Sequence, residues 1–485
     1  VSIPQGSSTT QFRYRDTLAD VHSLTVSDAA PIPPILIGDS VTITVVPSTT
    51  YRLVIDPTPV TITAGTVSDP IRVEREDFFG NNNFDDNSLQ VNLNTSSTSG
   101  EGEFQDVAFS PVSSVTIPKG SDFAEFRYTD ELADVFTLTA SATGIQADTQ
   151  DITVIADVPE HLAIITTTLV ITAGAPPFPI TIQRQDQFDN PAPDDDDLVI
   201  LLQKQSPQGS FLQSNSPTVI TQVTITETDA SFRYQDFQQG NWTLTYTDNG
   251  IFVASQPITV TAAVPAKLVY LQKPTTVIAG ERSTIFEVQR RDVYDNPYAG
   301  PEALTVYLTS SSTGAGKRFI NGIDATTVVT NMIIAGSTST TTFYYLDDKA
   351  GTHLITADDS GALTPATTTL NVQSAGANRL VFINNTISAT AGITSGLLTV
   401  QVQDNFGNAV TPTIGSPVNV GLSTDVPPAR FANAANNDDI TSLIIQGTSR
   451  ASFRYYDEQA ATANITAQPD GGLFSAVEPV VVWAA

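Results

Sequence analysis

The chain repeats a short signature at intervals of about 110 residues, and repetition with so long a period is typical of tandem domains. The signature is Phe-x-Tyr-x-Asp, and it occurs five times: Phe12-Tyr14-Asp16, Phe126-Tyr128-Asp130, Phe232-Tyr234-Asp236, Phe343-Tyr345-Asp347 and Phe453-Tyr455-Asp457. A chain of 485 residues is also too long for one hydrophobic core. We therefore expect several domains of one kind.

Two further markers keep the same order and spacing. An Asp-x-(Phe/Tyr)-(Gly/Asp)-Asn motif occurs at residues 77–81, 186–190, 292–296 and 404–408. An Ala-Gly pair precedes each motif, and its glycine, at Gly65, Gly174, Gly280 or Gly392, always lies twelve residues before the motif Asp. Three markers in one order indicate true repeats.

The markers predict four complete domains and part of a fifth. We expect complete domains at residues 48–159, 160–265, 266–375 and 376–485, joined by short linkers that contain Pro or Gly. Residues 1–47 read as the second half of a domain, because residues 1–14 closely match residues 115–128. Its missing first half is expected upstream in a longer natural protein, or from another chain by strand addition.

Within a repeat, apolar residues alternate with period two between turn residues, which is the pattern of β-strands. For the domain at 266–375 we expect seven strands, near residues 268–270, 276–278, 285–289, 304–308, 341–345, 353–356 and 368–372, with 276–278 continuing the first. Seven short strands in a domain of this size predict an immunoglobulin-like (Ig-like) sandwich. The predicted fold is all-β: tandem Ig-like β-sandwich domains arranged as an elongated rod.

The motif segments resemble a known family. The segment Val402-Gln403-Asp404-Asn405-Phe406-Gly407-Asn408-Ala409-Val410, with a later Phe-x-Tyr-x-Asp, looks like the bacterial Ig-like domains of invasin- and intimin-type adhesins and of S-layer and other prokaryotic surface proteins. The resemblance covers nearly the whole chain. It implies the sandwich fold, and a role as a stalk, an adhesive tip or a lattice tile.

Charge and composition limit the possible partners. The chain has 51 acidic and 22 basic residues, a net charge of −29, so it would repel nucleic acid and anionic membranes. Cysteine is absent, which excludes disulfides and thiolate metal sites, and no apolar run is long enough to cross a bilayer. We expect a secreted, extracellular cell-surface protein. Its expected partners are copies of itself or other surface proteins, with glycans as further candidates.

The Phe-x-Tyr-x-Asp residues are expected to be structural. Side chains alternate along a strand, so the Phe and Tyr share the inward face while the residue between them faces solvent. The Asp ends the strand, where its carboxylate can accept N–H groups of a turn. A binding role is the alternative.

The Asp-x-(Phe/Tyr)-(Gly/Asp)-Asn motif has two interpretations. In the first it is a tight turn whose Gly or Asp adopts a left-handed conformation. In the second, Asp and Asn oxygens join nearby acids in binding Ca²⁺, which takes six to eight oxygen ligands. The calcium candidates are Asp186, Asp189, Asn190, Asp194 and Asp195 in one domain and Asp77, Asn81 and Asp85 in another. Calcium is the only cofactor that the sequence suggests.

Catalysis has little support in the sequence. His22 and His353 stand where other repeats carry Phe, Trp or Ala, which indicates a packing position. His161 stands where other repeats carry Arg or Lys, which indicates a surface role. We therefore expect no enzymatic activity. Candidate N-glycosylation sites are Asn94, Asn241, Asn385 and Asn464.

Three functions fit these features. The leading hypothesis is a non-enzymatic structural protein of a prokaryotic cell surface: an S-layer, stalk or filament subunit. The second is an adhesin stalk that presents a receptor-binding tip. The third is a row of accessory carbohydrate-binding modules of a larger secreted protein. That third function would need recurrent exposed aromatic residues, but tryptophan occurs only at Trp242 and Trp483.

Overall fold

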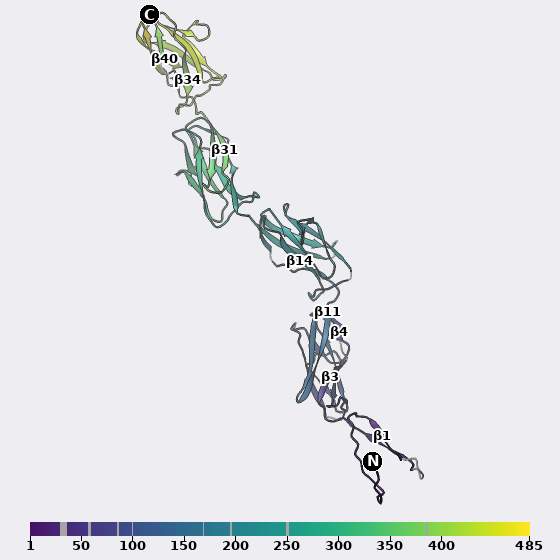
Figure 1. Ribbon diagram of the computed structural model, residues 1–485. Coiled ribbons are helices and arrows are strands. Elements are labelled where there is room, and N and C mark those ends of the chain that lie inside the picture. Colours follow the sequence, from purple (N-terminus) through teal and green to yellow (C-terminus); the bar gives the residue numbers. More distant parts are fainter. Residues whose placement is uncertain are drawn as a thin grey trace. The chain divides into compact units, whose positions relative to one another are not determined.

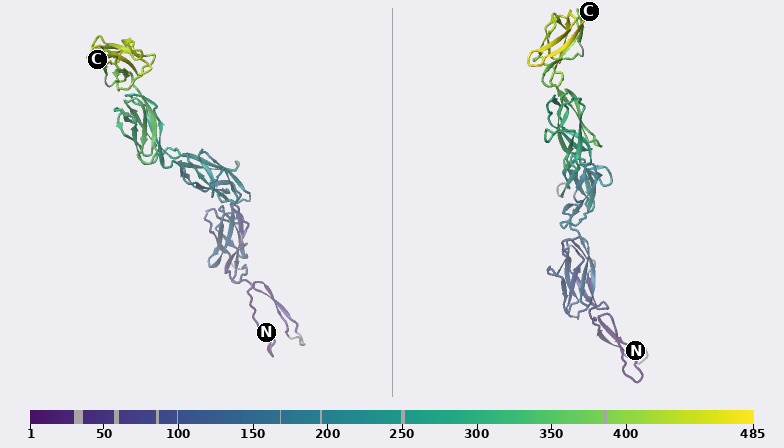
Figure 2. Two further views of the ribbon diagram at one scale, coloured as in Figure 1. Left: turned by 45° about the horizontal axis from the view of Figure 1, so that its top comes forward. Right: turned by 90° about the vertical axis from the view of Figure 1, so that its left-hand side faces the viewer.

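The computed structural model describes residues 1–29, 36–56, 60–84, 87–98, 100–167, 169–194, 196–248, 252–384 and 387–485. The described residues form strands and connecting turns and contain no helix. Figures 1 and 2 show the strands gathered in successive groups along the chain. The chain divides into two compact units, residues 1–169, 176–235 and 241–258 in one and residues 170–175, 236–240 and 259–485 in the other.

Three repeats share one topology of two five-stranded sheets. In the second sandwich, the sheets have the orders β12-β14-β19-β16-β17 and β13-β21-β20-β15-β18, and the third and fourth sandwiches follow the same pattern. The strands of the second sandwich are β12 (His161–Ile164), β13 (Leu169–Thr172), β14 (Phe178–Gln185), β15 (Leu198–Lys204), β16 (Ser210–Gln213), β17 (Val219–Ile220), β18 (Gln222–Ile225), β19 (Asp229–Gln235), β20 (Gly240–Thr247) and β21 (Val253–Thr261).

The third and fourth sandwiches repeat these ten strands. The third sandwich has β22 (Pro265–Gln272), β23 (Thr276–Ile278), β24 (Phe286–Asp292), β25 (Leu304–Ser310), β26 (Arg318–Asn321), β27 (Val328–Val329), β28 (Asn331–Ile334), β29 (Thr340–Leu346), β30 (Gly351–Asp358) and β31 (Ala366–Gln373). The fourth has β32 (Arg379–Phe382), β33 (Ile387–Thr390), β34 (Leu398–Gln403), β35 (Val418–Thr424), β36 (Arg430–Asn433), β37 (Asp439–Ile440), β38 (Ser442–Ile445), β39 (Arg450–Tyr456), β40 (Thr462–Pro469) and β41 (Ala476–Trp483).

The first sandwich joins its two layers into one nine-stranded sheet, because β3 pairs with β11 at Arg52 and Gln146. Its order is β7-β9-β5-β3-β11-β10-β6-β8, with β4 beside β11. The strands are β3 (Arg52–Asp56), β4 (Val60–Thr63), β5 (Ile71–Glu76), β6 (Leu89–Thr95), β7 (Glu103–Gln105), β8 (Ser114–Ile117), β9 (Phe123–Thr129), β10 (Val135–Ala142) and β11 (Ile145–Ile155).

Residues 1–47 contain one antiparallel hairpin, β1 (Val21–Val26) with β2 (Asp39–Thr44), and no other strand in their described part. Here Phe12 is 52% exposed and Tyr14 is 38% exposed. Their counterparts in the four sandwiches, such as Phe126 and Tyr128, are 0–1% exposed. The described residues thus cover these two rings less completely than the signature rings of the sandwiches.

Each core is built from side chains that alternate inward along strands of both layers. In the fourth sandwich one cluster unites Val400 of β34 and Phe453 of β39 with Val420 of β35 and Ile465 of β40, all fully buried. Burying each such side chain contributes about 1.5–3 kcal/mol. Every residue of this cluster lies between Leu380 and Val482, so the fourth sandwich has a core of its own.

The predicted all-β fold of tandem Ig-like sandwiches is confirmed, but the strand count was too low. The third sandwich has ten strands, and the three that were not predicted are β26, β27 and β28. They are two to four residues long, too short to show a clear alternation. Residues 276–278 do not continue the first strand: as β23 they pair with β31 in the opposite sheet.

Candidate interdomain joint

The Asp-x-(Phe/Tyr)-(Gly/Asp)-Asn motif forms the same tight turn in all four sandwiches. The N–H of its Asp donates to the carbonyl of its Asn, at 2.9 Å for Asp77 and Asp404 and 3.0 Å for Asp186 and Asp292. The residue before the Asn has positive φ: 87° at Gly80, 66° at Asp189, 72° at Asp295 and 90° at Gly407. Gly and Asp are among the few residues that tolerate this conformation, which explains their alternation at this position.

The Asp carboxylate joins the turn to the linker before its sandwich. In the second sandwich, Oδ1 of Asp186 accepts the N–H groups of Phe188 and Asn190, each at 2.9 Å. Its Oδ2 accepts the N–H of Asp157 and the side-chain amide of Asn190, also at 2.9 Å. The linker N–H that reaches Oδ2 is always 29 residues earlier in the chain: Ser48, Asp157, Ala263 and Ala375.

The Asn side chain binds the preceding repeat. Asn190 donates its amide to the carbonyl of Glu131 at 2.7 Å and accepts the N–H of Ala133 at 2.8 Å. The same pair of bonds links Asn81 to Thr17 and Ala19, Asn296 to Phe237 and Gln239, and Asn408 to Asp348 and Ala350. All of these partners lie in the corner that directly follows a Phe-x-Tyr-x-Asp signature.

The aromatic ring of the motif lies on the Ala-Gly turn of the preceding repeat. A Cβ atom on Gly65 would overlap the ring of Phe188, one on Gly174 would overlap Tyr294, and one on Gly280 would overlap Phe406. These glycines also have positive φ, between 71° and 82°. Only glycine meets both demands, so we expect any other residue there to disturb the contact.

The Phe-x-Tyr-x-Asp signature links the corner that binds the Asn to the Ala-Gly turn that contacts the aromatic ring. In the first sandwich, the hydroxyl of Tyr128 donates to Oδ2 of Asp130 at 2.7 Å, and Oδ1 accepts the N–H of Leu132 at 3.0 Å. The carbonyl of Asp130 accepts the N–H of Gly65 at 2.8 Å. The corner and the glycine turn are thereby fixed side by side. We call the whole contact, from turn to corner and glycine, the joint.

Hydrogen bonding lowers the pKa of the joint carboxylates Asp77, Asp186 and Asp404. Burial acts against ionisation of Asp77, but donation from Asn81, Ser48 and Phe79 outweighs it and holds the pKa of Asp77 at about 2. The same balance of burial against N–H donors lowers the pKa of Asp186 and of Asp404. The ionised form is therefore the one that the joint stabilises.

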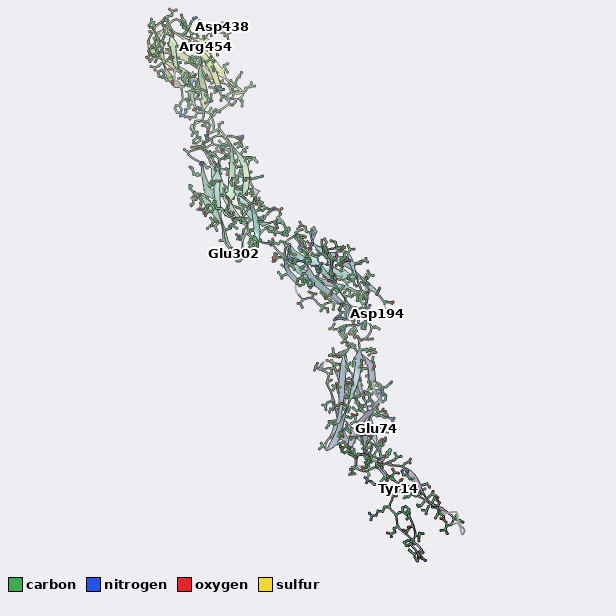
Figure 3. The ribbon with its side chains drawn as sticks, viewed as in Figure 1. Tyr14, Glu74, Asp194, Glu302, Asp438 and Arg454 are labelled. Atoms are coloured by element: carbon green, nitrogen blue, oxygen red, sulfur yellow. The ribbon has the colours of Figure 1, made fainter. Side chains whose placement is uncertain are left out.

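The calcium candidates occupy several different places. Asp186 and Asn190, like Asp77 and Asn81, meet at a joint, where N–H groups surround each carboxylate. Asp189 lies 3.1 Å from Nε2 of His161, and Asp194 (Figure 3) lies 3.9 Å from Nη1 of Arg184. Asp85 and Asp195 lie outside the described residues. Among the residues described, no three or more acidic or histidine side chains gather into a cluster suited to a metal ion.

The glycosylation candidates need one correction. Asn94, Asn241 and Asn464 are exposed on strands, and the amide of Asn464 donates to Asp425 at 2.7 Å. Asn385 lies outside the described residues and is the middle residue of its sequon, because Thr386 follows Asn384 by two positions. The acceptor position of that sequon is therefore Asn384, which donates to the carbonyl of Leu397 at 3.0 Å.

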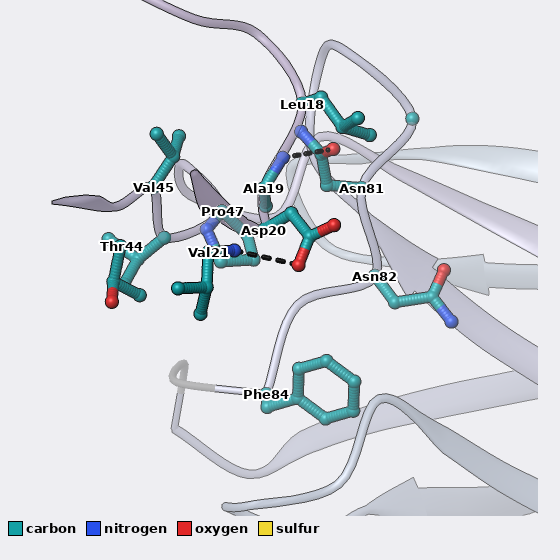
Figure 4. Close-up of a pocket in the computed structure, with 12 residues that line it drawn as sticks. Leu18, Ala19, Asp20, Val21, Thr44, Val45, Pro47, Asn81, Asn82 and Phe84 are labelled. Atoms are coloured by element: carbon teal, nitrogen blue, oxygen red, sulfur yellow. Dashed lines mark hydrogen bonds between the residues drawn. The ribbon is translucent and has the colours of Figure 1, made fainter. Parts of the chain in front are cut away.

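A cavity of about 470 Å³ lies beside the first joint (Figure 4). It is lined by Leu18, Ala19, Asp20 and Val21, by residues 44–47, and by Gly80, Asn81, Asn82 and Phe84. The bond from Ala19 to Asn81 crosses it. Its lining thus includes Ala19, Gly80 and Asn81 of the joint.

Three buried arginines organise the loop that follows the turn. Arg290 is 2% exposed, and its guanidinium donates to the carbonyls of Tyr298, Gly300, Glu302 and Thr338 at 2.8–3.0 Å. Arg75 and Arg184 make equivalent bonds to backbone carbonyls. In the fourth sandwich the same register position, opposite Leu380, holds Val402. In the first three sandwiches the positively charged guanidinium thus binds the backbone carbonyls of this loop and fixes its conformation.

The sequence did not reveal that the motif acts between repeats. The available signal was the constant spacing: linker N–H and motif Asp are 29 residues apart at every joint. The buried arginines were also missed, although Arg75, Arg184 and Arg290 each stand two residues before the motif Asp.

No helix among the described residues is long and apolar enough to span a membrane. No protein-family model matches the chain, and no curated protein matches it either.

Several solved structures of bacterial surface proteins are similar to the chain. An Escherichia coli adhesin, FdeC, aligns at 14% identity and a TM-score of 0.29, covering 68% of this chain and 98% of FdeC. Invasin, described as a bacterial integrin-binding protein, aligns at 12% identity and a TM-score of 0.33, covering 89% of this chain and 78% of the invasin chain. Domains 1–6 of the surface layer protein SbsC align at 13% sequence identity and a TM-score of 0.23. The alignment covers 87% of this chain and 54% of the SbsC chain. Each of the three is similar to the chain at low sequence identity.

Proposed function

We propose that the chain is a non-enzymatic structural protein of a prokaryotic cell surface, a subunit of an S-layer, stalk or filament. The observation that carries the proposal is the joint: its Asn bonds recur at four boundaries, and its contact between ring and glycine recurs at the three boundaries between sandwiches. Each joint ties the linker, the corner and the following turn together with hydrogen bonds. Repeated contacts of this kind restrain the motion between neighbouring repeats, which is what a structural element needs.

The surface composition supports the same proposal. A net charge of −29 keeps an extracellular protein soluble and excludes nucleic acid as a partner. The expected partners are further copies of the chain or other surface proteins, with glycans as additional candidates at the exposed Asn94 and Asn241.

The experiment is immunogold electron microscopy of intact cells of the source organism with antibodies against this chain. We expect label on the outside of unpermeabilised cells, arranged on a layer or on filaments. Label that appears only after permeabilisation would contradict the proposal. Label confined to the base of projections with a different protein at the tip would favour an adhesin stalk.

A further inference from the structure

The fourth sandwich carries a complete glycine turn that none of the described residues covers. Gly392 has φ of 77°, and its N–H donates to the carbonyl of Asp457 at 2.9 Å, as at the three occupied joints. A Cβ atom on Gly392 would meet no atom of the described residues within 4 Å. The glycine turn therefore already has the conformation that receives an aromatic ring at the other joints, and no described residue fills the space over Gly392. We call this space the seat.

The corner beside this glycine also offers the two backbone groups that an Asn side chain binds. At every joint the Asn bonds the carbonyl one residue after the signature Asp and the N–H three residues after it. In the fourth sandwich these groups belong to Glu458 and Ala460. The described residues provide no hydrogen-bond partner for the carbonyl of Glu458 or the N–H of Ala460.

A large apolar side chain stands next to the open glycine turn. Trp483 pairs with Thr390 across the sheet, its carbonyl accepts the N–H of Ala391 at 2.8 Å, and its side chain is 63% exposed. The other sandwiches have Ile155, Thr261 or Gln373 at this position. Tryptophan is enriched among residues that contribute most to protein interfaces.

We propose that Gly392, Glu458, Ala460 and Trp483 form a docking site for another Ig-like sandwich that carries an Asp-x-(Phe/Tyr)-x-Asn turn. The aromatic ring of that turn lies on Gly392, and its Asn bridges the carbonyl of Glu458 and the N–H of Ala460. The occupant is inferred from the three equivalent seats in this chain, each covered by such a turn. The proposal rests on the joint and is independent of where in the cell the protein acts.

The test joins a probe sandwich to the full chain so that even a weak contact is populated. Residues 374–485 are repeated directly after Trp483, which reproduces the natural spacing between Gln373 and Asp404. Because the chain has no cysteine, Val477, which is 56% exposed, can be replaced by cysteine in both the original and the added sandwich and spin-labelled. We expect pulsed electron spin resonance to give a narrow distance distribution, as for a formed joint.

Two variants and a control test the individual contacts. Gly392→Asn keeps the positive φ but places a side chain in the seat, and Phe406→Ala in the added sandwich removes the ring; each should abolish the narrow distribution. Gly471→Asn, at a second open glycine of positive φ in the same sandwich, should leave it unchanged. A broad distribution in the unsubstituted protein, or equal broadening by Gly471→Asn, would overturn the proposal.

Discussion

At the scale of single residues, the motif Asn is the most constrained side chain of the joint. Asn190 is 2% exposed and uses both amide hydrogens and its carbonyl oxygen, on Asp186, Glu131 and Ala133. No other residue type of this size presents two donors and an acceptor in this way. An aspartate would place a second carboxylate beside Asp186.

We predict that Asn190→Ala frees the second sandwich from the first without unfolding either. Two bonds to the preceding repeat are lost, each worth about 0.5–1.5 kcal/mol, while the core is untouched. Spin labels on exposed sites of the two sandwiches should give a broader distance distribution, with an unchanged melting temperature. Asn94→Ala, at an exposed strand position, is the matched control.

A second prediction concerns the buried arginines. Arg290→Met leaves the carbonyls of Tyr298, Glu302 and Thr338 without their donor, whereas the carbonyl of Gly300 keeps the N–H of Ser337. Unsatisfied buried acceptors cost about 1–3 kcal/mol each, so we expect the third sandwich to lose several kcal/mol of unfolding free energy. Urea titration measures the loss. The same change at exposed Arg318 should have almost no effect, and an equal loss there would contradict the cation role.

At the scale of elements, the joint is a fit between two turns. One turn supplies the ring and the Asn, and the other supplies a glycine that leaves room for the ring. Since a turn is held only by local bonds, its conformation also depends on the ionised Asp.

We predict that Gly280→Ala opens the fourth joint, whereas Gly392→Ala does not affect any joint. Both alanines adopt an unfavourable positive φ at a cost of about 1–2 kcal/mol, but only the one at 280 overlaps the ring of Phe406. Adding Phe406→Ala to Gly280→Ala should therefore remove the extra cost. Melting temperatures and spin-label distances for the single and double variants give the coupling. No coupling would refute the ring-on-glycine contact.

A pH prediction follows from Asp77. Its pKa of about 2 lies below the unfolded value of about 3.9, so its ionised form stabilises the fold above pH 4. That contribution, about 2 kcal/mol, is lost as the pH falls from 4 towards 2. Urea unfolding of the protein between pH 2 and 5 should show the loss. In Asp77→Asn the stability should be lower at pH 5 and should change less below it.

At the scale of the whole molecule, hydrogen bonds to the motif turn link neighbouring repeats. The carboxylate oxygens at the joints accept hydrogen bonds from N–H groups, as at Asp77. These bonds use the oxygen lone pairs that would otherwise bind a cation. The turn interpretation of the motif therefore accounts for all four copies, including the two without an acidic run after them.

We predict that chelation leaves the protein unchanged. A cation that binds only the native state raises the melting temperature. Because we expect no such binding, thermal unfolding with EDTA and with millimolar Ca²⁺ should give the same melting temperature. Magnesium at equal ionic strength is the control. A rise with Ca²⁺ that Asp194→Asn abolishes would instead establish the calcium site predicted from the sequence.

The repeat made the fold readable from sequence, because alternating apolar residues recur in register with fixed markers. Phe232 and Tyr234 share the inward face of β19, as the alternation predicts. Short strands such as β27 could not be predicted, since two residues carry no periodicity. The partner of Asn190 was also inaccessible, because residues 57 and 59 positions away become neighbours only through the fold.

Because each sandwich carries both a motif turn and a glycine turn, each of the three boundaries between sandwiches presents the same pair of surfaces. Loss or duplication of one whole repeat in the gene would therefore bring together a turn and a glycine that already match. Chain length can change in steps of one repeat without any compensating mutation. An insertion of half a repeat would instead leave the rings of one sandwich layer without the layer that covers them.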